Sequence, residues 1–422
     1  MPQSKISAPL VDAAIGAPRL NWRRFLLVAG PGIVVMLADT DAGSLITAAQ
    51  SGAQWGYRLI LLQFLLIPIL YLVQELTVRL GIVTRKGHAQ LIREQFGAFW
   101  ARVSVGALVV SCIGALLTEF SGLTGVGALV GVPAPVTLAV VVTLLLAMAV
   151  THKYLTVERI AICVGAFELV FLLVAWLAHP QGGELLSGAV SIPLTDGKYL
   201  YLASANIGAV IMPWMVFFQQ ASVVERGLTR ADLNAARLDT ALGAVLTQLV
   251  MAAALVATAA TLGRQGGEHA LDTVEEIAAA ITPFLGQFAG KLLFGLGMVG
   301  ASLVATIVVT LTAARAVAET LDKPNSLDNK PLEAPWFYGA YAAALILAAA
   351  IVSANVNLVA LSVGVQVMNA LLLPLVVGFL FLLARRLPDP YRLKGVYGAV
   401  ATTLTTIAVV FGVVSGLAGL FS

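Results

Sequence analysis

Long apolar runs, separated by short polar stretches, recur along the whole chain. A helix needs about 20 mostly apolar residues to span a bilayer, and the sequence predicts eleven such segments. They cover residues 25–50, 57–82, 101–131, 134–151, 159–178, 201–225, 237–262, 286–320, 335–353, 358–385 and 396–420. The pattern therefore predicts an all-α membrane protein in which residues 1–422 form a single transmembrane domain.

Composition agrees, because 59% of the residues are hydrophobic and only 11% are charged, against about 25% charged in soluble proteins. Cys112 and Cys163 both lie in apolar runs, so no disulfide framework is expected. The chain contains no HExxH, GxSxG or Walker motif. We therefore expect no enzyme, cofactor, nucleic-acid ligand or protein partner; the bilayer and a transported solute are the expected partners.

Positive charge predicts the orientation of the spans. If the N-terminus is cytoplasmic, 21 of the 25 Lys and Arg residues fall on the inside, as the positive-inside rule requires. Only Arg58, Lys198, Arg264 and Lys291 fall outside. We expect a bacterial inner (plasma) membrane protein with its C-terminus outside.

The first predicted span is interrupted near its middle by polar residues, Asp39, Thr40, Asp41 and Ser44. Ionisable groups in hydrocarbon are costly and mark ion pathways. An unwound segment would add free carbonyl oxygens to these carboxylates, and such oxygens bind hard cations. Asp41 is the leading ligand, whereas Asp39 is either an alternative ligand or a helix cap.

The sixth predicted span has a second interruption at Pro213. Proline has no N–H, so a carbonyl one turn upstream, near Ala209, loses its donor. Met212 adds a thioether, which suits softer metals. Breaks five spans apart predict two inverted five-helix repeats, with a further helix at the end; the bounds are about 22–178, 201–386 and 396–420.

Five stretches resemble the Nramp family (natural resistance-associated macrophage proteins) of divalent-metal transporters, and the resemblance extends over about residues 22–386. They are Gly30-Pro-Gly32, Asp41-Ala-Gly-Ser44, Gln74-Glu75-Leu-Thr-Val-Arg79-Leu-Gly-Ile-Val-Thr84, Ala209-Val-Ile-Met212-Pro213, and Gln366 with Leu373-Pro374. The resemblance implies a LeuT-like fold with broken first and sixth helices. It also implies a cation site made by Asp41, Ser44, the Ala209 carbonyl, the Met212 sulfur and Gln366.

Three departures from the family pattern concern proton coupling and ion choice. Ser44 replaces the family's ligand asparagine, and Trp214 replaces the histidine that follows Met-Pro. Glu119 aligns with a glutamate of the family's proton route, but Leu116 stands where its aspartate belongs. These changes resemble the Nramp-related magnesium transporter branch.

Other polar residues have structural interpretations. Glu75 and Arg79, one turn apart, are expected to form a structural ion pair, and Glu168 to hydrogen-bond between helices. For Glu119, and for Gln219 and Gln220, a role in the ion path and a structural role are both open. Asn369 shares a helix face with Gln366 and is a further candidate for the ion's hydrated shell.

The leading hypothesis is a secondary transporter that imports Mg²⁺, with Mn²⁺ as an additional cargo, by alternating access and without proton coupling. One alternative is a proton-coupled Mn²⁺ or Fe²⁺ symporter of the ordinary family type, favoured by Met212 and opposed by Trp214 and Leu116. A more distant alternative is a sodium-coupled transporter of organic solutes on the same fold. Asp41 opposes it, because its charge would repel a substrate carboxylate.

Overall fold

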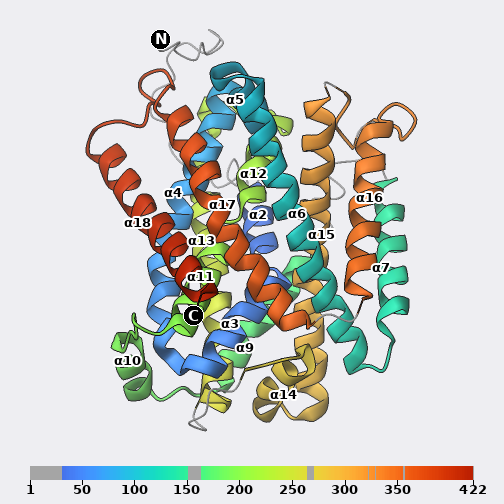
Figure 1. The fold of residues 1–422 in the computed structure, drawn as a ribbon, viewed down its shortest axis with the longest axis vertical. Helices are drawn as coiled ribbons and strands as arrows, with labels where there is room; N and C mark the ends of the chain where they lie inside the picture. Colours follow the sequence, from blue (N-terminus) through green and yellow to red (C-terminus); the bar gives the residue numbers. More distant parts are fainter. Residues whose placement is uncertain are drawn as a thin grey trace.

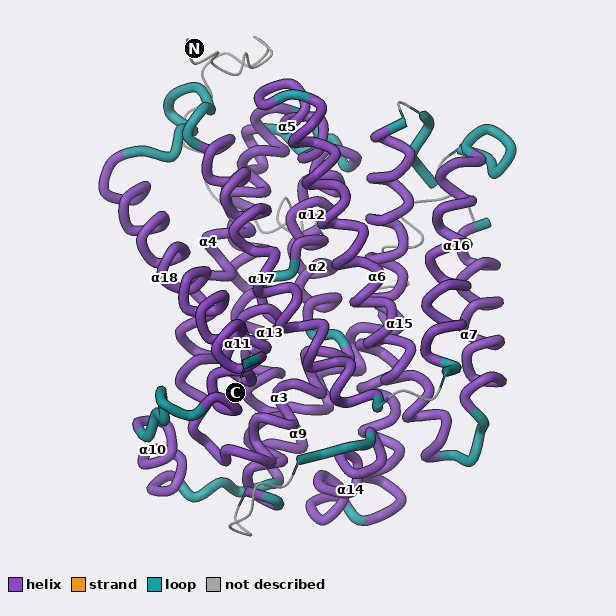
Figure 2. The backbone as a smooth tube through the Cα atoms, in the orientation of Figure 1, coloured by secondary structure: helices purple, strands orange, loops and turns teal. Residues whose placement is uncertain are grey.

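The computed structural model describes residues 31–150, 163–263, 270–321, 323–327, 329–354 and 357–421. All regular structure in these ranges is helical, and Figure 2 shows long helices joined by short loops. The α-helices are α2 (Pro31–Asp39), α3 (Ala42–Trp55), α4 (Ile60–Thr84), α5 (His88–Phe96), α6 (Ala98–Leu129), α7 (Ala134–Ala149), α9 (Val170–Leu177), α10 (Gly182–Val190), α11 (Gly197–Val210), α12 (Pro213–Glu225), α13 (Leu233–Thr261), α14 (Val274–Leu285), α15 (Gln287–Thr320), α16 (Pro335–Val352), α17 (Leu358–Ala384) and α18 (Gly395–Leu420). Short 3-10 turns are η1 (Gly56–Leu59), η2 (Ala166–Leu169) and η3 (Arg230–Asp232).

Each of the eleven predicted segments overlaps at least one of these helices, although residues 25–30, 151 and 159–162 of the prediction lie outside the described residues. The prediction of an all-α membrane protein is confirmed. Large apolar side chains remain exposed along the outer helices, for example Leu65 at 55%, Val140 at 62% and Ile407 at 60%. Such a surface requires lipid rather than water around it.

In the described part, eight helices are long and apolar enough to cross a membrane, or nine if the bent pair Cys163–Leu177 and Gly182–Val190 is one span. This count takes Ala42–Thr84 as one run of 43 residues, which as a straight helix would be about 65 Å long, twice the hydrocarbon thickness. The chain instead turns at Gly56, whose φ is +58°, and α4 runs back along the molecule (Figure 1). The number eleven stays a prediction.

The sequence analysis missed three short helices, α5, α10 and α14, because they lie between the predicted spans. Helix α14 begins at Val274, between the seventh and eighth predicted spans. Its start carries a recognisable signal, since the Thr273 hydroxyl accepts a hydrogen bond from the Glu276 N–H (3.2 Å). Figure 1 shows α5 at one end of the molecule and α10 and α14 at the other.

Tight helix packing brings the predicted site segments together. Helix α13 packs against α2, α3 and α4, and α11 packs against α17 and α18. Gly208 of α11 lies so close to α17 that a Cβ atom there would overlap the Gln366 carbonyl oxygen. The sixth predicted span is therefore fixed beside the tenth at the depth of its break.

Candidate cation site

The first predicted span is broken at Thr40 and Asp41, between α2 and α3. Asp41 has an extended backbone (φ −75°, ψ 173°) and is the N-cap of α3. Its Oδ1 accepts a hydrogen bond from the Ser44 N–H at 2.6 Å, whereas its Oδ2 is buried and has no partner within the described residues. One carboxylate oxygen thus holds the helix end, and the other is left for a ligand.

Glu119 of α6 completes the cap. Its Oε2 accepts a hydrogen bond from the Ala42 N–H (3.1 Å), and its Oε1 accepts one from the Thr118 hydroxyl (3.3 Å). The first N–H groups of a helix have no partner inside the helix and carry partial positive charge. The two carboxylates therefore stabilise the start of α3 at the break.

The sixth span is broken at Ile211 and Met212, between α11 and α12. Pro213 begins α12 and cannot donate to the Ala209 carbonyl, which would be its helical partner. That carbonyl accepts instead from the Ser44 hydroxyl at 3.1 Å. Ser44 therefore joins the two breaks directly, and Asp41 and Ala209 face a common position.

Two N–H groups beside the second break point at methionine sulfur atoms. The Trp214 indole N–H lies 3.2 Å from the Met212 sulfur, and the Met212 N–H lies 3.4 Å from the Met215 sulfur. Both Met212 and Trp214 are fully buried. The indole directs a donor at the thioether, so the sulfur's electron pairs are only partly available to a soft ion.

Gln366 and Asn369 of α17 reach the same region. Gln366 lies against Gly43, and its amide nitrogen has no partner within the described residues. Asn369 donates to the Gln366 amide oxygen (3.0 Å) and accepts from the Ser111 hydroxyl (2.7 Å). If the Asn369 and Gln366 amide groups both rotate by 180°, both hydrogen bonds are kept with donor and acceptor exchanged, because the Ser111 hydroxyl can also accept. The pair can thus present either an N–H or a carbonyl oxygen to the site.

The assembled site is closed to solvent. Asp41, Ser44, Met212 and Gln366 are 0% exposed and Ala209 is 1% exposed. Asp39, at the end of α2, is also fully buried, and neither of its carboxylate oxygens has a partner within the described residues. Carboxylate, carbonyl and amide oxygens in a dry, negatively charged space are suited to a hard divalent cation.

Comparison with known proteins gives the family. A family model described as natural resistance-associated macrophage protein-like (Nramp) matches residues 32–418. The chain belongs to the Nramp family. A relative named divalent metal cation transporter MntH, from Aeromonas hydrophila, is 28% identical over 320 residues, which cover 72% of this chain and 75% of the relative.

Solved structures confirm the LeuT-like fold of this Nramp-family chain. The manganese transporter of Eremococcus coleocola, solved with an aromatic bis-isothiourea compound, matches with a TM-score of 0.75 at 19% identity, over 99% of this chain and 92% of that one. Mhp1, a nucleobase-cation-symport-1 family transporter, matches with a TM-score of 0.62 at 13% identity, over 93% and 92%.

The structure thus brings Asp41, Ser44, Ala209 and Gln366 of the Nramp-family chain together, with Glu119 and Asn369 beside them. Met212 lies in the second break, where its sulfur contacts the Trp214 indole, and Asp39 lies two residues before Asp41 at the end of α2. We expected Glu168 to hydrogen-bond between helices. Its side chain lies beside the Thr40 hydroxyl, between α2 and α3, and interacts with Asp41. Neither carboxylate oxygen makes a hydrogen bond of ordinary geometry within the described residues. A single polar residue in an apolar run does not reveal which way it faces.

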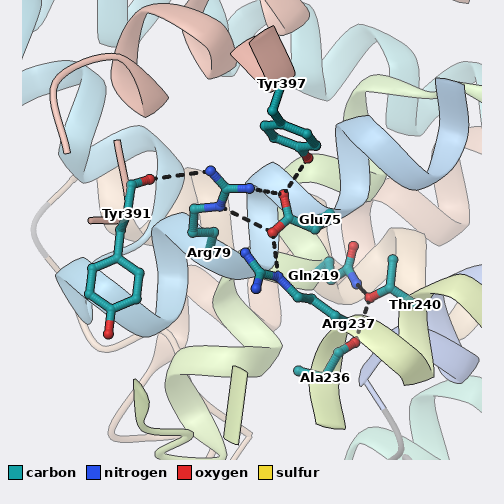
Figure 3. A network of polar contacts seen from close by, with 8 residues as sticks. All are labelled: Glu75, Arg79, Gln219, Ala236, Arg237, Thr240, Tyr391 and Tyr397. Carbon is teal, nitrogen blue, oxygen red and sulfur yellow. Dashed lines mark hydrogen bonds and ion pairs between the residues drawn. The ribbon is translucent and has the colours of Figure 1, made fainter. Parts of the chain in front are cut away.

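A separate ionic network joins α4 to α13 and α18 (Figure 3). Glu75 accepts from Arg79 (2.5 Å), from Arg237 of α13 (2.7 Å) and from the Tyr397 hydroxyl of α18 (3.1 Å). The predicted structural pair of Glu75 and Arg79 is confirmed, and the network extends it to two further helices. Gln219 and Gln220 both hydrogen-bond to other segments, since Gln219 donates to Thr240 (3.2 Å) and Gln220 donates to the Lys86 carbonyl (2.8 Å). The Gln219 amide oxygen has no partner within the described residues, so a role in the ion path stays a prediction.

Proposed function

We propose that this Nramp-family chain is a secondary transporter that imports divalent cations, Mg²⁺ first and Mn²⁺ in addition. The observation that carries the proposal is the unpaired, fully buried Oδ2 of Asp41, opposite a carbonyl that a second helix break has freed. An isolated buried carboxylate is very unfavourable. A passing cation would neutralise it. The names of the MntH relative and of the Eremococcus transporter support a divalent metal as cargo.

We propose alternating access as the mechanism. The site is buried from both sides, so the ion can enter or leave only when helices move. Broken helices suit this motion, because each half can tilt about the break. Import would be driven by the membrane potential, worth about 2.3 kcal/mol per charge per 100 mV and twice that for a divalent ion. The two inverted repeats, about 22–178 and 201–386, and the cytoplasmic N-terminus remain part of this proposal.

The preference for Mg²⁺ follows from the ligand set. Magnesium keeps several waters and favours oxygen. Ser44 is shorter than the family's asparagine and its hydroxyl already donates to the Ala209 carbonyl, so a water can replace the missing amide ligand. The Met212 sulfur receives the Trp214 indole N–H, which lowers its value for a soft metal.

The absence of proton coupling is also proposed from the residues at the site. Histidine is the side chain that changes charge near neutral pH, and Trp214 stands in its place. Leu116, fully buried on α6, cannot carry a proton toward Glu119. His88 is in α5, where its Nδ1 lies 2.9 Å from the Gln220 amide oxygen, away from both breaks.

A proton-coupled Mn²⁺ or Fe²⁺ symporter is the second candidate. The Met212 sulfur favours it, because it is buried beside the freed carbonyl, and a thioether binds softer ions than Mg²⁺. A sodium-coupled carrier of organic solutes is disfavoured by the several bare carboxylates at the site.

The test is uptake into liposomes that contain the purified protein, with Mg²⁺ and Mn²⁺ measured beside internal pH. We expect saturable Mg²⁺ uptake at constant internal pH. Acidification in step with Mn²⁺ uptake, without Mg²⁺ uptake, would establish the second candidate instead. Uptake of neither ion would remove both.

A further inference from the structure

Glu168 is a buried charge without a role in the site described so far. It lies in η2, which packs against α15 and directly follows Gly165, a residue in close contact with Leu37 of α2, and it is 0% exposed. Neither carboxylate oxygen has a hydrogen-bond partner within the described residues. A buried carboxylate either takes up a proton or has its charge compensated by a partner, and a passing cation is such a partner.

Close packing fixes η2 beside the first break. A Cβ on Gly165 would lie 2.9 Å from the Leu37 side chain of α2, and a Cβ on Gly300 of α15 would lie 2.7 Å from the Val164 carbonyl. The Glu168 side chain interacts with Asp41 and, more weakly, with Asp39. Thr40 is adjacent, but its hydroxyl donates to the Met36 carbonyl (3.2 Å). Glu168 therefore lies beside the first break, next to Thr40 and close enough to Asp41 and Asp39 to interact with them.

The break as a whole gathers four acidic side chains. Asp39, Asp41, Glu119 and Glu168 are all fully buried, and within the described residues no Lys, Arg or His interacts with them. Glu119 has a partner inside the protein, because it accepts a hydrogen bond from the Ala42 N–H at the start of α3. An uncharged group gives independent evidence for a ligand, since the Gln366 amide also ends beside Gly43 without a partner for its nitrogen.

We propose that Glu168 is a further residue of the transport site and holds the incoming divalent cation through its bound water. This inference rests on the proposed function. An ion at Asp41 and the Ala209 carbonyl still carries waters if it is Mg²⁺. Those waters are strong donors, and the two bare oxygens of Glu168 accept from them. Glu168 thereby favours an ion that enters with its hydration shell.

The consequence is a difference between ions. Changing a group that holds a metal's outer shell typically weakens metal binding about 10- to 100-fold. Glu168→Gln keeps the shape but removes the charge. We expect it to weaken Mg²⁺ binding about tenfold and Mn²⁺ binding by less than about threefold, because Mg²⁺ gives up water more reluctantly. Glu168→Asp keeps the charge and should restore Mg²⁺ binding in part.

The experiment titrates the purified full chain with Mg²⁺ and Mn²⁺ by calorimetry and measures uptake of both ions in liposomes. Cobalt(III) hexaammine, whose ligands do not exchange, is added as an inhibitor that imitates fully hydrated Mg²⁺. Glu276→Gln, an exposed carboxylate on α14, is the matched control. We expect Glu168→Gln to lose inhibition by cobalt hexaammine together with Mg²⁺ affinity, while the control matches the wild type.

Equal Mg²⁺ affinity in the wild type and Glu168→Gln would overturn the inference. Equal loss for Mg²⁺ and Mn²⁺, with unchanged inhibition by cobalt hexaammine, would also overturn it and make Glu168 a structural residue. If the wild type binds cations but transports none, the proposed function fails, and the affinities still decide the role of Glu168. If it binds none, both fail. Thermal unfolding of each variant shows whether it is folded.

Discussion

The two helix breaks meet at one site but are built in opposite ways. At the first break, carboxylates satisfy the freed N–H groups of α3, through Asp41 to Ser44 and Glu119 to Ala42. At the second break, Pro213 removes a donor, and the Ala209 carbonyl is exposed to the site. The first break supplies charge, and the second supplies a neutral oxygen and a sulfur.

This difference assigns separate tasks to the two breaks. Charge at the first break determines whether a divalent ion can be held at all, because it offsets the cost of removing the ion from water. The neutral groups at the second break determine which ion fits and how the site is closed. Changes at the first break should therefore affect all ions, whereas loss of the sulfur at the second break should affect ions unequally.

The largest effect is expected from Asp41→Ala. Removing one partner of a buried charge pair costs about 3 to 5 kcal/mol, which corresponds to at least about 100-fold in affinity. Uptake of Mg²⁺ and Mn²⁺ into liposomes should fall together below detection. Retained uptake of either ion would show that a residue other than Asp41 supplies the charge that holds the ion.

Pro213→Ala should lower uptake about tenfold while leaving the protein at least as stable. Alanine restores an N–H that can bond to the Ala209 carbonyl, and it is a better helix former than proline. The carbonyl would then be withdrawn from the ion. Pro68→Ala in α4, an exposed position far from the breaks, is the matched control. A loss of uptake that is equal in both variants would contradict the role of the second break.

Met212→Leu should separate the ions. The substitution keeps the volume of the side chain and removes its sulfur, so we expect Mg²⁺ uptake within about twofold of the wild type and Cd²⁺ uptake reduced about fivefold. Met251→Leu, buried in α13, serves as the control. If Mg²⁺ uptake falls as far as Cd²⁺ uptake, Met212 is needed for packing rather than for selectivity.

The smallest effect is expected from Ser44→Ala, which removes the hydrogen bond between the breaks. A hydrogen bond contributes about 0.5 to 1.5 kcal/mol. The lower end applies here because water can take the place of the hydroxyl, and it is equivalent to a change of about twofold. Uptake should fall by about that factor for both ions, whereas Ser187→Ala, at an exposed hydroxyl on α10, should change nothing. An unchanged rate in Ser44→Ala would show that other contacts hold the breaks together.

Sequence reasoning reached the fold and the two breaks because both have strong local causes. Two carboxylates in an apolar run and a proline after a thioether are unlike continuous helix, and the spacing of Gln366 and Asn369 correctly put both on one face of α17. It could not find the environment of Glu168, which depends on how η2 packs against α2. It also missed α14, although the pair Thr273 and Glu276 carried a capping signal.

The most direct test of the central claim is anomalous diffraction from crystals of the protein soaked in Mn²⁺. The account predicts one strong peak within about 2.5 Å of both the Asp41 carboxylate and the Ala209 carbonyl oxygen, and no such peak in Asp41→Ala. A peak away from both breaks, in a protein that still transports Mn²⁺, would contradict it.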